Sequence, residues 1–146
     1  MSRRVSPQEA SQLIAKEGYV YIDVRSAAEF DRGHPAGAVN VPLLDMNAAL
    51  GGLTPNPQFL EVIEKLFGRE AKLIVGCQMG GRSARAAQVL ERAGFTAIAD
   101  QYCGFDGAKD MMGRMTQPGW SGAGLPVEVD ARADRRWKGL QTRARQ

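Results

Sequence analysis

Residues 72–85 read KLIVGCQMGGRSAR, and this stretch decides what fold the chain can adopt. Leu73–Val75 is a short apolar run, as expected for a parallel strand that is covered on both faces. After Arg82, apolar residues recur at helical spacing up to a glycine that can end the helix, Gly94. The stretch therefore predicts a buried strand, a loop and a helix, with Cys77 opening the loop.

The loop has the composition of an anion site. Gly80 and Gly81 allow backbone conformations in which successive N–H groups converge on one point, and the helix directs its positive end to the same point. Arg82 and Arg85 stand in the first helical turn, where the helix dipole disfavours cations, so an anionic substrate or sulfur explains them better than helix stability does. With the Ser83 hydroxyl, these groups favour a thiolate nucleophile.

Length and composition indicate one domain. The chain has 146 residues, of which 44% are hydrophobic, which is enough for a core of its own. No apolar run approaches the length of a membrane span, and the N-terminus lacks a secretory signal pattern. Two cysteines, Cys77 and Cys103, are too few for a disulfide framework, and a reactive thiol needs a reducing compartment. We therefore expect a soluble cytoplasmic protein.

Positive charge gathers near the C-terminus. Residues 130–146 hold six basic and two acidic side chains, so the net charge of +3 comes from this segment. Aromatic side chains are scarce there, which favours a solvated or partly helical tail over a nucleic-acid-binding segment. We expect a domain over residues 1–129 and a basic tail over residues 130–146, with neither nucleic acid nor a membrane as partner.

The rest of the chain alternates between strand and helix patterns. Further strands are predicted at Val5, Tyr19–Val24, Ala38–Val41 and Phe95–Asp100. Helices are predicted at residues 7–17, 26–31, 57–67 and from residue 106 through Ala108, Met111 and Met112, with residues 43–52 irregular apart from one helical turn. This alternation predicts an α/β fold with a mostly parallel five-stranded sheet and helices on both faces.

Three polar residues near predicted strand ends have competing interpretations. Asp23 lies where parallel sheets place their ligands, so a catalytic carboxylate has to be considered. Paired with Arg25 it can instead tie loops together by charge-assisted hydrogen bonds, which we favour. His34, the only histidine, lies in a turn between Gly33 and Pro35. An already ionised thiol needs no base, so we expect a structural role for this histidine.

Residues 77–83, CQMGGRS, resemble the active-site loop of the rhodanese family of sulfurtransferases, its single-domain members in particular. Further segments resemble the family's sequence in the right order: DVR at 23–25 with EF at 29–30 and GH at 33–34, GAVNVP at 37–42, and GLPV at 124–127. The resemblance covers residues 5–128. It implies a rhodanese-like domain, and it gives Asp23, Arg25 and His34 structural positions near the site.

The resemblance implies a sulfurtransferase with Cys77 as catalytic residue. The thiolate attacks the outer sulfur of a small anionic donor, with thiosulfate favoured, and the resulting persulfide passes sulfur to cyanide, a thiol or a protein thiol. Because the cysteine carries the sulfur, neither a metal nor an organic cofactor is expected. The expected substrate-binding residues are Gln78, Met79, Gly80, Gly81, Arg82, Ser83 and Arg85.

Other functions use similar residues. Cysteine phosphatases and arsenate reductases also place a Cys-to-Arg loop at a helix N-terminus, but those that resemble this fold enclose one residue more than the four between Cys77 and Arg82. A smaller ring suits one sulfur atom better than a tetrahedral phosphate. A binding or sulfur-carrier module with the same fold and little catalytic activity is a further alternative, and so is a buried structural cysteine beside a tight turn.

The second cysteine follows the strand predicted at residues 95–100. Parallel strands point the same way, so Cys103 can lie at the same sheet edge as Cys77. There it can act as a resolving thiol that accepts sulfur or forms a disulfide. Alternatively it is a small residue where the family more often has glycine, and the sequence leaves both open.

Overall fold

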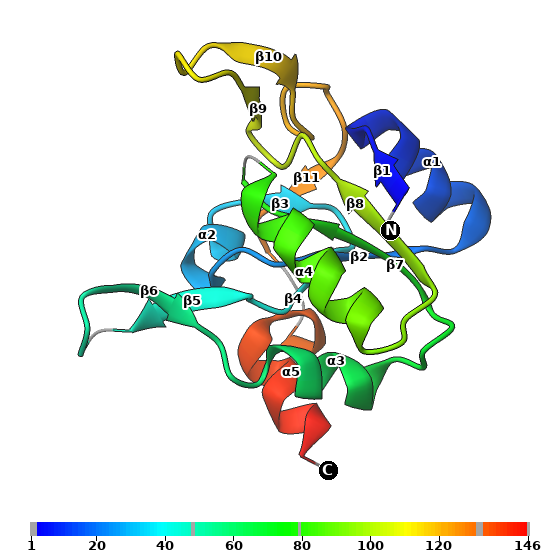
Figure 1. The fold of residues 1–146 in the computed structure, drawn as a ribbon, viewed down its shortest axis with the longest axis vertical. Coiled ribbons are helices and arrows are strands. Elements are labelled where there is room, and N and C mark those ends of the chain that lie inside the picture. Colours follow the sequence, from blue (N-terminus) through cyan, green and yellow to red (C-terminus); the bar gives the residue numbers. More distant parts are fainter. Residues whose placement is uncertain (1–2, 48, 79, 131–132, 146) are drawn as a thin grey trace.

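A five-stranded parallel sheet forms the centre of the protein (Figure 1). The computed structural model describes residues 3–47, 49–78, 80–130 and 133–145. Across the sheet the strands are β1 (Arg3–Val5), β8 (Ala97–Gln101), β7 (Lys72–Gly76), β2 (Val20–Asp23) and β4 (Val39–Asn40). Every neighbouring pair is parallel, which confirms the predicted α/β class and sheet.

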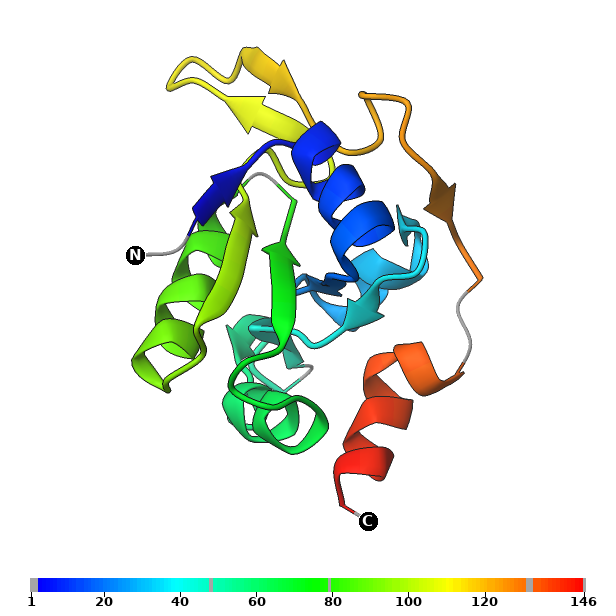
Figure 2. The same cartoon turned by 90° about the vertical axis from the view of Figure 1, so that its right-hand side faces the viewer.

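Helices cover both faces of this sheet. Successive side chains of a strand point to opposite faces, so each strand contributes to two buried clusters. Leu73 and Val75 of β7 belong to one buried cluster, with α3 (Phe59–Leu66), α4 (Gly81–Arg92) and α5 (Trp137–Ala144). Ile74, between them, belongs to the cluster on the other face, with α1 (Pro7–Glu17) and α2 (Ala27–Asp31). Figure 2 shows α1 and α4 on opposite sides of the sheet.

The first two helices begin with the same capping box. In α1, the Ser6 hydroxyl accepts from the Glu9 N–H at 3.1 Å, and the Glu9 carboxylate accepts from the Ser6 N–H at 3.0 Å. In α2, Ser26 and Glu29 make the same reciprocal bonds at 3.3 and 3.2 Å. Both caps follow from local sequence: α1 begins at the predicted residue 7, and α2 begins at Ala27, one residue after its predicted start.

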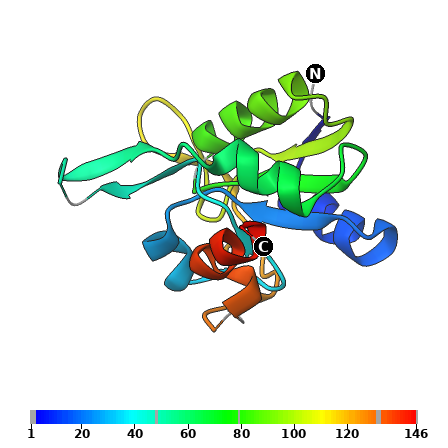
Figure 3. The same ribbon diagram turned by 90° about the horizontal axis from the view of Figure 1, so that it is seen from below.

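Residues 43–52 differ from the prediction. Instead of an irregular segment with a helical turn, β5 (Leu44–Asn47) and β6 (Gly52–Pro55) form an antiparallel hairpin. The hairpin projects from the body of the molecule (Figure 3). Met46 and Leu53 are exposed and no residue of either strand is buried, so these segments lack the sequence pattern of a half-buried strand.

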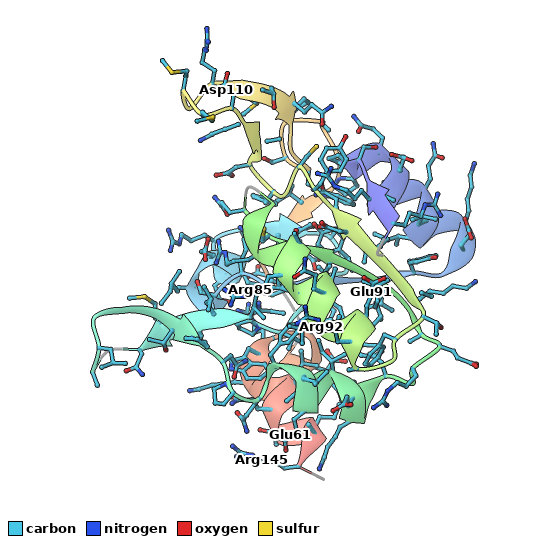
Figure 4. All side chains as sticks on the ribbon, viewed as in Figure 1. Glu61, Arg85, Glu91, Arg92, Asp110 and Arg145 are labelled. Carbon is cyan, nitrogen blue, oxygen red and sulfur yellow. The ribbon has the colours of Figure 1, made fainter. Side chains whose placement is uncertain are left out.

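The helix predicted through Ala108 and Met112 is also wrong. Here β9 (Gly107–Lys109) and β10 (Met115–Pro118) form a second antiparallel hairpin, with Asp110 at its turn (Figure 4). The Asp110 carboxylate accepts the N–H groups of Met112 and Arg114, both at 2.9 Å. This local turn replaces the first helical turn, and the exposed methionines would give a helix no face to bury.

The C-terminal segment forms a short 3-10 turn, η1 (Ala133–Arg135), followed by α5. Trp137 and Leu140 of α5 are buried in the cluster that also holds α3, so this segment is partly helical but not a solvated tail. A two-residue antiparallel pair joins β11 (Val127–Glu128) to β3 (His34–Pro35). In the part of the chain that the structure describes, no helix is both long and apolar enough to cross a membrane.

Candidate active site

Cys77 follows β7 directly, and the start of α4 surrounds its sulfur. The Sγ accepts hydrogen bonds from the backbone N–H groups of Gly80 at 3.1 Å and of Ser83 at 3.3 Å. Both donors lie at the N-terminus of the helix, where the dipole adds positive potential. We call these two donors, the N–H groups of Gly80 and Ser83, the cradle. Among the described residues, the expected N–H groups of Gln78, Gly81 and Arg82 make no hydrogen bond to the sulfur, and Met79 lies outside the described residues.

The cradle depends on glycine at two positions. Gly80 has φ +105°, and a Cβ there would stand 2.4 Å from the Tyr102 carbonyl oxygen. Gly104 has φ +70°, and a Cβ there would meet the Gln78 carbonyl oxygen, also at 2.4 Å. Next to Gly104 in the chain, the Phe105 N–H donates to the Cys77 backbone carbonyl at 2.7 Å. The backbone of residues 102–105 thus packs directly against the cysteine loop and leaves no room for a side chain at Gly80 or Gly104.

The Ser83 hydroxyl does not point to the sulfur. It is fully buried and lies 2.6 Å from the Asp100 carboxyl and 3.1 Å from the Gly80 carbonyl oxygen. The expected role of this hydroxyl as a substrate donor is therefore not what the geometry shows, because only the Ser83 N–H reaches Cys77. The hydroxyl instead links the start of α4 to Asp100 of β8.

Asp100 is a site residue that the sequence analysis missed. Burial raises its pKa, against the Ser83 hydrogen bond and the charge of Arg4, which lower it. The Ser83 hydroxyl donates to the Asp100 carboxyl, so Asp100 fixes the direction of this hydroxyl. The sequence offers one signal, a carboxylate at the end of the strand predicted at residues 95–100; the register that places Asp100 beside Val75 of β7 is seen only in the structure.

Arg82 is paired within the protein. Its guanidinium makes a bidentate ion pair with Glu29 of α2, at 2.7 and 2.9 Å. Burial opposes ionisation of Glu29, but hydrogen bonds and charge from Arg82 outweigh it and lower the pKa of Glu29 to about 2. The same hydrogen bonds raise the pKa of Arg82. The arginine expected to bind the donor is thus neutralised by a carboxylate.

Arg85 lies one turn further along α4 and is exposed. Within the described ranges, no hydrogen bond or ion pair from its guanidinium is found. Figure 4 labels it beside α4, on the side that faces the β5–β6 hairpin. Of the two arginines predicted for anion binding, Arg85 is therefore the one with an available charge.

The Gln78 side chain is held by hydrogen bonds to Arg25 and Asp106. Arg25 donates to the side-chain Oε1 of Gln78 at 3.0 Å, and the side-chain Nε2 of Gln78 donates to Asp106. Arg25 also pairs with Asp23 at 2.7 Å and donates to the Gly33 carbonyl at 2.6 Å. Asp23 and Arg25 therefore join three loops, as their spacing in the sequence suggested. Charge-assisted bonds of this kind fix geometry strongly.

His34 is engaged on both ring nitrogens. Nδ1 contacts the Phe30 carbonyl at 2.8 Å, and Nε2 contacts Glu128 at 3.1 Å. The ring also stacks on Phe30, with centroids 3.6 Å apart. These contacts join α2, β3 and β11, which agrees with the structural position expected for this histidine.

Cys103 is buried, and its thiol contacts the Gln117 side-chain oxygen at 3.2 Å. Burial raises the pKa of this thiol, against an opposing effect of Tyr102 and Arg4. Both cysteines are free. A protonated, buried thiol is a poor nucleophile, which weighs against the resolving role.

Two cavities flank the cysteine loop. One of about 540 Å³ lies between the β5–β6 hairpin, α3 and the start of α4, and includes Gly81, Arg82 and Arg85. The other, of about 240 Å³, is bordered by Glu29, Gln78 and other polar residues. Among the described residues, no group of three or more His, Cys, Asp or Glu side chains could hold a metal.

Comparison with known proteins agrees with this geometry. The rhodanese-like domain family matches residues 6–110. Thiosulfate sulfurtransferase 16, chloroplastic, of Arabidopsis thaliana is 40% identical over 127 residues, which cover 84% of this chain and 94% of that protein. Rhodanese-like domain-containing protein 15, chloroplastic, of the same plant is 40% identical over 94 residues, covering 64% of this chain but only 50% of that protein.

Solved structures lead to the same family. The crystal structure of Rv0390 from M. tuberculosis aligns with a TM-score of 0.70 at 29% identity, covering 88% of this chain and 98% of that one. The human single-domain sulfurtransferase TSTD1 aligns with a TM-score of 0.52 at 26% identity, covering 72% and 93%. The plant relatives are chloroplastic proteins, so these comparisons do not support the expected cytoplasmic location. The chain belongs to the rhodanese-like domain family.

Proposed function

We propose that the protein is a sulfurtransferase that carries sulfane sulfur from an anionic donor, with thiosulfate favoured, as a persulfide on Cys77. The observation behind this proposal is the position of the Cys77 Sγ, 3.1 Å from the Gly80 nitrogen and 3.3 Å from the Ser83 nitrogen. N–H donors at a helix N-terminus stabilise an anion. They serve first the thiolate and then the terminal sulfur of the persulfide.

The reaction divides into two displacements. The Cys77 thiolate attacks the outer sulfur of thiosulfate, the sulfur–sulfur bond of the donor breaks, and sulfite leaves with the electron pair. Cyanide or a thiolate then attacks the terminal sulfur of the persulfide, and the cysteine thiolate is restored. Arg85 supplies the positive charge for the donor. Because the two substrates use the site in turn, ping-pong kinetics are expected.

The test is the intact mass of the protein after thiosulfate and then after cyanide. The wild type should gain one sulfur atom and lose it to cyanide, while Cys77→Ser should gain none. Cys103→Ser is the matched control and should behave as the wild type, since that thiol is buried and contacts Gln117, not the Cys77 sulfur. Absence of the gain with thiosulfate would contradict the proposed donor. A gain that cyanide cannot remove would indicate a sulfur carrier instead of a transferase.

A further inference from the structure

A third cavity, of about 460 Å³, lies at the edge of the sheet, where residues of α2, β4, β5 and α5 border it (Figure 1). Its volume is in the range of sites that enclose a small organic ligand, about 300–1,000 Å³. Leu44 borders the larger cavity beside the cysteine loop, whereas the next residue of β5, Asp45, borders this one. The two cavities therefore lie on either side of β5.

Asn40 of β4 brings an unused hydrogen-bond acceptor to this cavity. Its Nδ2 donates to the backbone carbonyl oxygens of Asp23 at 3.0 Å and of Arg25 at 2.9 Å. Since carbonyl oxygens can only accept, these contacts identify the nitrogen, and the other amide atom is the oxygen Oδ1. The residue is 1% exposed, and no donor among the described residues reaches that oxygen. Because buried polar atoms normally have partners, a ligand in this cavity should bring a donor to Asn40.

A carboxylate adds negative charge to the same cavity. One oxygen of the half-buried Asp45 accepts the Ala27 N–H at 3.1 Å, and within the described ranges no cation pairs with this carboxylate. The other carboxylate at the cavity, Asp31, is paired with Arg136 at 2.6 Å. An ammonium group suits both Asn40 and Asp45, because it carries a positive charge and three N–H donors.

Helix α5 supplies the cavity with an apolar wall and a positive charge. The wall is the aromatic side chain of Trp137. The charge is that of Lys138, which is exposed and has no ion-pair partner in the part of the chain that the structure describes. A ligand with an ammonium group alone would leave this lysine unpaired, whereas a carboxylate on the same ligand pairs with it.

We propose that this cavity binds a small zwitterion with an apolar body, which is the chemistry of a free apolar amino acid. The ammonium group binds Asn40 Oδ1 and Asp45, the carboxylate pairs with Lys138, and the apolar body packs on Trp137. The site is distinct from the cysteine loop, since none of the described residues that border it belongs to residues 77–85.

The test is isothermal titration calorimetry with three probes that share a phenyl body. L-Phenylalanine carries both charged groups, phenethylamine lacks the carboxylate, and 3-phenylpropanoate lacks the ammonium group. L-Phenylalanine should bind saturably, and each of the other two at least about tenfold more weakly. In a ¹⁵N–¹H spectrum, the side-chain NH₂ signal of Asn40 should shift with L-phenylalanine and not with 3-phenylpropanoate.

Two variants each remove one charge from the site. Asp45→Asn keeps an oxygen for the Ala27 N–H, and it should weaken L-phenylalanine about tenfold while leaving 3-phenylpropanoate unchanged. Lys138→Met keeps the carbon stem, and it should weaken L-phenylalanine several-fold while leaving phenethylamine unchanged. The matched controls are Glu61→Gln and Lys65→Met, which remove exposed charges of α3 outside the cavity and should keep the wild-type affinity.

Absence of saturable binding of L-phenylalanine up to about 10 mM would overturn the inference. So would equal affinity for phenethylamine, an Asn40 signal that does not shift, or equal losses in the control variants. Cys77→Ser should bind L-phenylalanine as the wild type does. Failure of Cys77 to load sulfur would therefore refute the proposed function and leave this inference standing.

Discussion

Replacing Glu29 by Gln removes one charge from the Glu29–Arg82 ion pair and changes little else. A glutamine at this position can still accept the Ser26 N–H, so the capping box of α2 survives. Arg82 loses its bidentate partner, whose oxygens lie 2.7 and 2.9 Å away. The substitution therefore isolates the contribution of the ion pair to the stability of the fold.

Lowering a carboxyl pKa from its usual 4.5 to about 2 stabilises the folded state by about 3 kcal/mol at neutral pH. The Arg82 and Glu29 side chains are 19% and 20% exposed, so solvent screens part of the attraction. We expect Glu29→Gln to lower the free energy of unfolding by about 2 kcal/mol. Because the folded-state pKa is the lower one, this stabilisation is complete above about pH 4.5 and is lost as the pH falls towards 2.

The assay is urea denaturation of the wild type and Glu29→Gln at about pH 7 and about pH 3. The difference between them should fall to less than half at the lower pH. Glu9→Gln is the matched control, because Glu9 holds the same place in the capping box of α1 with no arginine hydrogen-bonded to its carboxylate among the described residues. Equal losses in the two variants, or a Glu29→Gln loss that does not change with pH, would refute the reasoning.

Further substitutions test the support of the cradle and of the core. Asp100→Asn still offers an oxygen acceptor to the Ser83 hydroxyl and should keep most of the sulfur-transfer kcat/KM, whereas Asp100→Ala should lower it about tenfold. Gly80→Ala places a Cβ 2.4 Å from the Tyr102 carbonyl, so kcat/KM should fall about 100-fold. Leu140→Ala should lower the free energy of unfolding by about 2–4 kcal/mol in urea, whereas a solvated tail predicts no change.

Local determinants explain which parts of this structure the sequence predicts. The helix start at residue 7, the apolar run before Cys77 and the glycines after it depend on a few neighbouring residues, and each feature appears where it was expected. The position of the cysteine and its donor Gly80 could be predicted for the same reason, whereas the Ser83 N–H was not among the expected loop amides. Only four residues separate Cys77 from Arg82, so the loop has little freedom.

The partners of the site's side chains could not be predicted in this way. Arg82 meets Glu29, which lies 53 positions earlier in the chain. Ser83 meets Asp100 only because β8 lies beside β7 in the register observed. Sequence analysis thus predicted that the loop carries positive charge, but not that a carboxylate takes up the charge of Arg82 and leaves Arg85 available.

The two hairpins were missed because their side chains contribute little to the core. Met111 is fully exposed and Met46 is 59% exposed, so hydrophobicity carries no information about which face is buried. The turn residues determine the structure of such segments instead. In the second hairpin these are Asp110, whose carboxylate accepts a backbone N–H, and Gly113, which has a left-handed φ of +79°. Apolar residues in exposed hairpins mislead a method that equates apolar with buried.

The place of α5 in the fold has a consequence for biosynthesis. Helix α5 packs on α3 and beside β4, and a ribosome makes both of these elements before it reaches Trp137. Until Trp137 and Leu140 emerge from the exit tunnel, the apolar surface that they cover stays open to water. A ribosome that stalls before residue 137 therefore presents an incomplete domain with an exposed apolar surface. Chaperones bind nascent chains of this kind.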